Sequence, residues 1–157
     1  MTTRRTVLIS IVAALYVVLT VGIAPLSFGP IQFRVSEALK VIVLFDPWLS
    51  LGIGIGTFFA NLSSPFVGPW ELIWMPLTDM IGGVLAWAIY RVLRRRWMVL
   101  PCAVYALTTG ASVALMLWAL GIDAFPISFA LISASELAIL FGAIPLLSPV
   151  KQWLSQT

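Results

Sequence analysis

Long apolar runs dominate the pattern of hydrophobic and polar positions along this 157-residue chain. A helix needs about 20 predominantly apolar residues to cross a lipid bilayer. Four runs reach that length, at residues 7–24, 71–90, 99–120 and 125–147. The pattern therefore predicts four clear membrane-spanning helices.

The stretch at residues 33–62 is long enough for two further spans. Asp46-Pro47 interrupts it, and such a pair favours a turn and disfavours helix before the proline. The first part, residues 33–45, covers only about 20 Å at a rise of 1.5 Å per residue. We expect it to begin in a loop buried by the other helices or to tilt little. The prediction is an all-α membrane protein, one domain of six transmembrane helices over residues 1–157.

Basic residues predict the orientation, because Lys and Arg near helix ends accumulate on the cytoplasmic side of a membrane. One basic cluster precedes the first span, a second follows the fourth span and a third follows the sixth. An even number of spans separates them, so all three fall on one side and both termini are expected in the cytoplasm. The clusters are Arg4 and Arg5; Arg91, Arg94, Arg95 and Arg96; and Lys151. The first span could also be a secretory signal ending at Gly22-Ile23-Ala24, but the even topology then fails.

Composition supports a membrane protein and excludes several enzyme classes. Hydrophobic residues make up 61% of the chain and charged residues 10%, whereas soluble domains are about a quarter charged. Histidine is absent from the sequence, and Cys102 is its single cysteine. A zinc enzyme, a Ser-His-Asp hydrolase and an internal disulfide are therefore not expected, nor is a cofactor.

Small residues recur every four positions along four of the predicted helices, which lets helix backbones approach closely. For three of these stripes we expect packing inside the bundle. The first stripe is equally suited to docking a partner membrane subunit. The stripes are Thr6, Ser10 and Ala14; Gly52, Gly56 and Ala60; Ala106, Gly110 and Ala114; and Ala130, Ala134, Ala138 and Gly142.

The remaining ionisable residues are mostly acidic, and several fall within spans, where charge is costly unless it is paired or functional. Under the predicted topology one group lies at the outer face: Arg34, Glu37, Asn61, Trp70 and Glu71. Glu136 lies about 15 Å deep at 1.5 Å per residue, and Asp79 and Thr109 reach a similar depth. We expect these eight residues to line one pocket that opens to the outside.

Simpler interpretations remain open for each part of this pocket. Arg34 and Glu37, three residues apart, could neutralise one another, and Glu71 could be a solvated helix start. Asp79 and Glu136 are harder to dismiss, because the four clear spans hold no basic residue at comparable depth. One of them could still be a protonated acid bonded to a neighbouring helix. Asp123 lies in a loop and is expected to be solvated.

The segment from Gln32 to Leu39, QFRVSEAL, and the Leu44-Phe45-Asp46-Pro47 turn carry a family resemblance. Together with Asn61-Leu62, Trp70-Glu71 and Ser135-Glu136, these segments resemble those of the QueT family. Members of that family are substrate-binding S components of energy-coupling factor (ECF) transporters. The resemblance implies a six-helix S component in the cell membrane that captures a micronutrient at its extracellular face. It also implies a transmembrane coupling subunit and two cytoplasmic ATPases as partners, with Thr6, Ser10 and Ala14 as the docking face.

QueT relatives are associated with queuosine precursors, which are 7-deazaguanines such as the 7-aminomethyl form, or the free base queuine. Matched by position, the resemblance assigns Arg34, Glu37, Asn61, Glu71 and Glu136 to the binding site. Depth alone adds Trp70, Asp79 and Thr109.

Our hypothesis gives each part of this site a role in binding the deazapurine. A buried carboxylate, with Glu136 favoured, accepts two hydrogen bonds from the guanine-like edge, and Trp70 contacts the ring. Glu71 or Asp79 meets a cationic substituent. Competing functions are an S component for another vitamin or nucleobase, a membrane-embedded enzyme and a structural membrane protein; nothing in the pattern points to nucleic acid.

Overall fold

The computed structural model describes residues 2–29 and 32–155, and its regular structure there is helical, as predicted. The long helices are α1 (Thr3–Gly22), α4 (Leu49–Asn61), α5 (Met75–Val92), α6 (Val99–Ala119) and α7 (Phe125–Ser155). Short segments connect them: α2 (Ala24–Ser27), the 3-10 helix η1 (Val35–Leu39), α3 (Lys40–Val43) and the π-helix η2 (Trp70–Trp74).

Among the described residues, four helical segments are long and apolar enough to cross a membrane: Thr3–Gly22, Trp70–Val92, Val99–Ala119 and Phe125–Leu147. They match the four clear spans predicted from the hydrophobic pattern to within a few residues at each end. α4 is also apolar but has only 13 residues. The prediction of a multi-pass helical membrane protein is therefore confirmed in its main elements.

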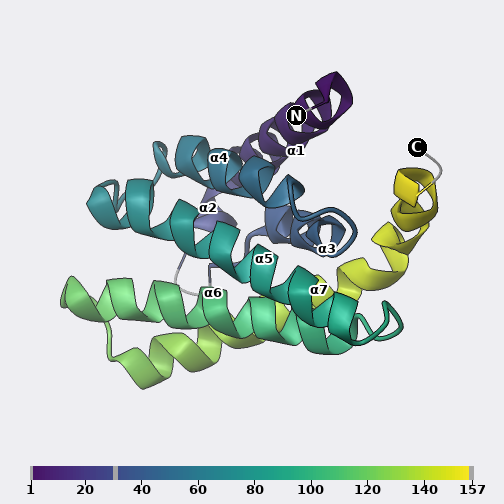
Figure 1. Ribbon diagram of the computed structural model, residues 1–157. Coiled ribbons are helices and arrows are strands. Elements are labelled where there is room, and N and C mark those ends of the chain that lie inside the picture. The colour runs from purple at the N-terminus through teal and green to yellow at the C-terminus, as the bar shows by residue number, and fades with distance from the viewer. Residues whose placement is uncertain (1, 30–31, 156–157) are drawn as a thin grey trace.

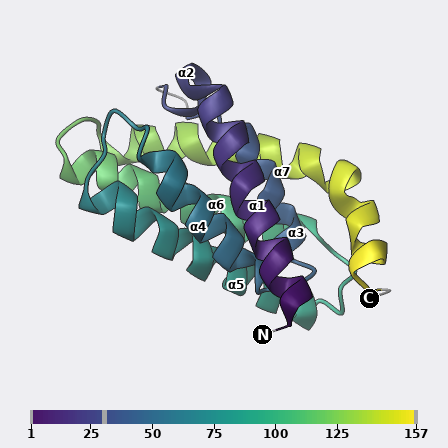
Figure 2. The ribbon, with the colours of Figure 1, turned by 90° about the horizontal axis from the view of Figure 1, so that it is seen from above.

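The segment formed by η1 and α3 is the centre of the bundle. It follows an extended residue, Arg34, and ends before the Asp46-Pro47 turn, so a short helical segment lies where the short span is predicted. η1 packs against α1 and α7, and α3 packs against α4, α5 and α7. Val41 and Val43 are completely buried. All four residues of α3 are buried, and Figures 1 and 2 show α3 lying among the longer helices.

The longer helices surround this segment in a chain of neighbouring pairs. α1 packs on α4, α4 on α5, α5 on α6, and α6 on α7. Figure 2 looks down on α1, which lies across α4. The yellow C-terminal part of α7 turns away from the rest of that helix in both views (Figures 1 and 2). Pro145 and Pro149 lie inside α7, and each removes a helix hydrogen bond and causes such a bend.

Glycines in α4 set the close approach of α1. A Cβ atom at Gly52 would lie 2.8 Å from the backbone oxygen of Ile9, and one at Gly56 would lie 2.7 Å from the Cβ of Tyr16. At the α6–α7 contact, a Cβ at Gly110 would collide with Ser133. The stripes containing Gly52 and Gly110 therefore pack inside the bundle, as predicted.

The fourth stripe was wrongly predicted to pack inside the bundle. Its four members are exposed, and a Cβ at Gly142 would meet nothing within 4 Å. The inward face of α7 carries larger side chains instead, including Ile132 and Leu140. Four-residue spacing identifies one face of a helix but does not say toward which side it points. The members of the exposed stripe are Ala130, Ala134, Ala138 and Gly142.

A Gly56→Ala substitution is expected to destabilise the protein. Overpacking of a tight contact costs about 1–3 kcal/mol, which outweighs the helix-propensity gain of at most about 1 kcal/mol from replacing glycine. Thermal unfolding in detergent measures the effect. Gly142→Ala is the matched control, because the added methyl group meets no neighbour and stability should hold or rise. A fall in stability of the same size in both variants would contradict the assigned contact.

Candidate functional site

The ammonium group of Lys40 lies at the centre of the bundle and joins three helical elements. Its Nζ atom is 2.8 Å from Oδ1 of Asp79 on α5 and 2.9 Å from Oγ1 of Thr109 on α6. It also forms an ion pair with Glu37, three residues earlier, and lies 3.9 Å from Oε2 of Glu136 on α7. We call Lys40, Glu37, Asp79, Thr109 and Glu136 the Lys40 cluster.

Neighbouring hydroxyl groups hold two of the three acids in place. The Tyr16 hydroxyl donates to Oε1 of Glu37, and Oγ1 of Thr57 donates to Oδ2 of Asp79 at 2.6 Å. The Tyr105 hydroxyl donates to the backbone oxygen of Asp79 at 2.7 Å, and its ring centroid is 4.9 Å from the Lys40 ammonium. Side chains from α1, α4 and α6 thus support the cluster.

Glu136 differs from the other two acids because Lys40 holds it less closely, at 3.9 Å, than it holds Glu37 or Asp79. Its Oε2 atom has no hydrogen-bond partner among the described residues, although the side chain is 3% exposed. Buried polar atoms are normally paired with protein, water or a ligand. The geometry therefore leaves Glu136 ready to accept a hydrogen bond from a further group.

Charge in the Lys40 cluster is unbalanced in favour of the acids. One ammonium group faces three carboxyl groups, all of them nearly inaccessible to solvent. Burying uncompensated charge is costly, and the cost falls when an opposite charge or a proton neutralises it. The arrangement therefore suits a ligand that carries a positive charge or several N–H donors.

A second polar group lies at the end of α4, around Arg34. Its Nη1 donates to Oδ1 of Asn61 and its Nε donates to the backbone oxygen of Ser27, both at 3.2 Å. Nδ2 of Asn61 donates to the backbone oxygen of Glu71 at 2.9 Å. In the described part of the chain, Oε2 of Glu71 has no hydrogen-bond partner. Arg34, Asn61 and Glu71 therefore form a connected group with its own free acceptor.

A π-helix positions Glu71 in this group. η2 spans Trp70–Trp74 and closes with the Met75 N–H donating to the Trp70 oxygen. Such turns are rare and occur mostly at functional sites. Glu71 points inward and is 1% exposed, whereas Trp70 is only half-buried and makes an edge contact with Trp74 at 5.8 Å between ring centroids.

Seven of the eight predicted site residues fall into these two groups, and Trp70, which precedes Glu71, packs against the apolar cluster that includes Met75 and Met116. Asp79, Thr109 and Glu136, predicted at one depth, do meet at one ammonium group. The seven are at most 6% exposed. In the described part of the chain these seven side chains are therefore closed off from solvent, whereas a pocket open to the outside is predicted.

Lys40 is the residue that the sequence interpretation missed. The four clear spans hold no base at the depth of Asp79 and Glu136, because Lys40 lies in the short central segment. Its spacing of three residues from Glu37 was an available signal. The alternative that Arg34 and Glu37 neutralise one another is not what their contacts show, because Glu37 pairs with Lys40 and Arg34 bonds Asn61. Asp123 is exposed, as expected.

Comparison with known proteins assigns this arrangement to a family. A family model described as "QueT transporter" matches residues 6–152, which is nearly the whole chain. The chain belongs to the QueT transporter family. The two polar groups and the apolar helices are therefore parts of a multi-pass membrane protein that belongs to a family of transporters.

A curated relative is similar over part of its length. It is the "Queuosine precursor transporter QueT" of Lactococcus lactis subsp. cremoris (strain MG1363), 47% identical over 60 residues. The match covers 37% of this chain and 36% of the relative, so about a third of each protein is compared. No solved structure matches the chain significantly.

Lys40→Met is expected to destabilise the protein by about 3–5 kcal/mol, the cost of leaving buried charges without their partner. Unfolding in detergent measures the loss. Lys151→Met is the matched control, because the only other lysine of the sequence lies near the surface. Adding Asp79→Asn to Lys40→Met should recover part of the stability. Equal, small effects of both lysine substitutions would show that Lys40 does not hold the acids together.

Proposed function

We propose that this chain is the substrate-binding S component of an ECF-type importer that captures a 7-deazaguanine precursor of queuosine. Family membership and the printed function of the curated relative support transport of such a compound. The observation that carries the proposal is the Lys40 cluster, in which three buried carboxyl groups meet one base and Glu136 keeps a free acceptor.

Contacts at one end of the bundle support the six-span topology with both termini in the cytoplasm. Arg5 at the start of α1 lies 3.5 Å from Asp46, so the chain returns to its starting end within the first 46 residues. Arg95 after α5 and Lys151 in α7 reach the same end, where Lys151 donates to the backbone oxygen of Arg95. These three returns to one end support six passes through the bundle.

The chemistry of a 7-deazaguanine matches the free acceptors of the site. Its ring N–H and exocyclic amino groups form an edge of adjacent donors, which a single carboxylate binds through both oxygens. Glu136 supplies such a carboxylate at the middle of α7, with Oε2 unused. An aminomethyl substituent adds a cation, which the surplus carboxyl groups around Lys40 or the free Oε2 of Glu71 neutralise.

Substrate entry requires this closed arrangement to open at the Arg34 end. The ion pairs of Lys40 then belong to the ligand-free protein, and bound substrate replaces some of them. Trp70 is half-buried next to Glu71 and offers a ring surface for stacking at the entrance. Arg34 and Asn61, which tie the extended segment before η1 to α4, are the contacts that opening must loosen.

The exposed face of α1 is the proposed docking surface for the coupling subunit, which works with two ATPases. Thr6, Ser10 and Ala14 all lie on the exposed side of α1, while Ile9, Val12 and Tyr16 face the bundle. Short side chains on an exposed membrane helix permit a close approach by another helix. ATP hydrolysis by the partner subunits would drive release of substrate to the inside.

Glu136→Gln is expected to abolish the rise in melting temperature that 7-aminomethyl-7-deazaguanine produces in the purified protein. The amide keeps the shape of the side chain but replaces one acceptor oxygen by a donor, so it can no longer accept both hydrogen bonds. Asp123→Asn, in an exposed loop, is the control and should respond like the wild type. A wild-type response by Glu136→Gln would contradict the assignment.

The ligand series in the same assay separates the substrate classes. The aminomethyl form should stabilise the wild-type protein more than the neutral 7-cyano analogue, and an unrelated vitamin should have no effect. Equal stabilisation by the cyano and aminomethyl forms would remove the proposed role of the surplus carboxyl groups.

Ser10→Trp is expected to reduce copurification of the coupling subunit and uptake of radiolabelled substrate in proteoliposomes. A bulky ring on this face prevents close helix approach, while ligand binding by the isolated protein should persist. Ile11→Trp is the matched control, because Ile11 is also exposed but lies on a neighbouring face of α1. Equal losses in both variants, or uptake without the ATPase subunits, would count against the docking surface.

A further inference from the structure

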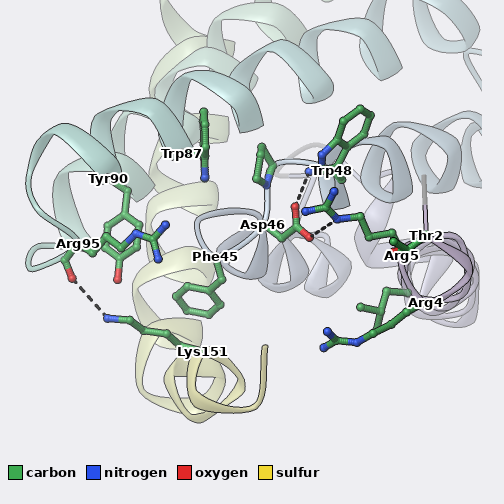
Figure 3. A pocket seen from close by; sticks show the side chains of 12 residues that line it. Thr2, Arg4, Arg5, Phe45, Asp46, Trp48, Trp87, Tyr90, Arg95 and Lys151 are labelled. Carbon is green, nitrogen blue, oxygen red and sulfur yellow. Dashed lines mark hydrogen bonds and ion pairs between the residues drawn. The ribbon is translucent and has the colours of Figure 1, made fainter. Parts of the chain in front are cut away.

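A cavity of about 890 Å³ lies at the end of the bundle opposite Asn61, where α1 begins and α7 turns away. Four basic side chains line it: Arg4, Arg5, Arg95 and Lys151. Figure 3 shows Arg95 and Lys151 on one side and Arg4 and Arg5 on the other, with Phe45 and Asp46 between them. The cavity thus collects bases from three separate parts of the sequence.

The single acid among the lining residues is already engaged. Oδ2 of Asp46 lies 3.5 Å from Nε of Arg5, and its Oδ1 accepts the backbone N–H of Trp48 at 3.1 Å. Lys151 contacts the backbone oxygen of Arg95 at 3.4 Å and lies over the ring of Tyr90, neither of which neutralises its charge. The cavity therefore keeps an excess of positive charge.

The turn that carries Arg95 is held in a conformation that side chains rarely adopt. Arg94 and Arg95 have φ angles of 53° and 58°, in the left-handed region where a helix end normally places glycine. The Arg95 N–H donates to the backbone oxygen of Tyr90 at 2.9 Å, which fixes the turn. Strained residues persist where surrounding structure determines them, often at binding sites.

Residues that flank this turn in the sequence line an apolar hollow. Leu93 and Trp97, two residues to either side of Arg95, line a second cavity of about 440 Å³ together with Val99, Leu100 and Ala103. A basic site that is two residues along the chain from an apolar hollow suits a molecule with an anionic head and a hydrocarbon tail. A free phosphate would use the basic part alone.

We propose that the basic cavity binds the phosphate headgroup of an anionic phospholipid, with an acyl chain along the apolar hollow by Trp97. Guanidinium groups form paired hydrogen bonds to phosphate oxygens, and basic pockets between membrane helices favour anionic lipid headgroups. Because the site joins the ends of α1, α5 and α7, bound lipid links the three parts of the chain. This inference does not depend on which substrate the protein carries.

The test compares dioleoyl phosphatidylglycerol, dioleoyl phosphatidylcholine and inorganic phosphate added to the full-length protein in neutral detergent. Phosphatidylglycerol should raise the melting temperature clearly more than the other two. The double variant Arg95→Gln/Lys151→Gln should lose more than half of that difference. Arg94→Gln/Arg96→Gln removes the same charge beside the cavity, from residues that do not line it, and should keep the difference.

Three outcomes of the melting assay would overturn the proposal. Equal losses in the two double variants would mean diffuse attraction by the basic end and no defined site. Equal stabilisation by phosphatidylcholine would show no headgroup selectivity, and equal stabilisation by inorganic phosphate would identify a small-anion site. Native mass spectrometry of the wild-type protein provides a second readout independent of variant folding, with retention of phosphatidylglycerol over phosphatidylcholine as the expected result. Lack of that preference would contradict the proposal.

Discussion

The buried ammonium group of Lys40 is the interaction on which the arrangement of this bundle depends. Lipid tails are as apolar as helix surfaces, so hydrophobicity alone does little to choose which membrane helices pair and in which register. Lys40 binds acids on its own segment, on α5 and on α7, and a threonine on α6. A single cation with these partners fixes the relative depth of four elements, a specificity that uniform apolar contacts lack.

Placing this cation at the centre requires a short segment and close packing around it. The Asp46-Pro47 turn ends the helical segment soon after Lys40, so the surrounding helices enclose η1 and α3. Gly52 and Gly56 let α1 approach α4 closely, and this approach brings the Tyr16 hydroxyl onto Glu37. Backbone proximity and electrostatics are therefore coupled, because loosening the α1–α4 contact also removes a donor from one of the acids.

Much of the fold was predictable because bilayer length constrains apolar runs strongly. Depth followed from the rise per residue, which is why Asp79, Thr109 and Glu136 were predicted together and are found together. The partner, Lys40, was missed because its segment is too short for a hydropathy argument. The buried face of α7 was also wrongly predicted. Four-residue spacing groups Ala134 with the other small residues but does not say whether their face or the face of Ile132 points into the bundle. Closure of the site depends on side-chain pairing across helices, which spacing does not encode.

The distribution of charge divides the molecule into an acidic interior and a basic end. Bases at the ends of α1, α5 and α7 meet around one cavity, while the surplus carboxyl groups are buried in the middle of the bundle. For the proposed importer this separation has a mechanical consequence. The basic end can stay anchored at an anionic membrane surface, while the polar contacts of Arg34 and Asn61 at the other end loosen to admit substrate. A cationic substrate would then compete with Lys40 for the same carboxyl groups, so its capture and release would be coupled to rearrangement of the interaction that sets the helix positions.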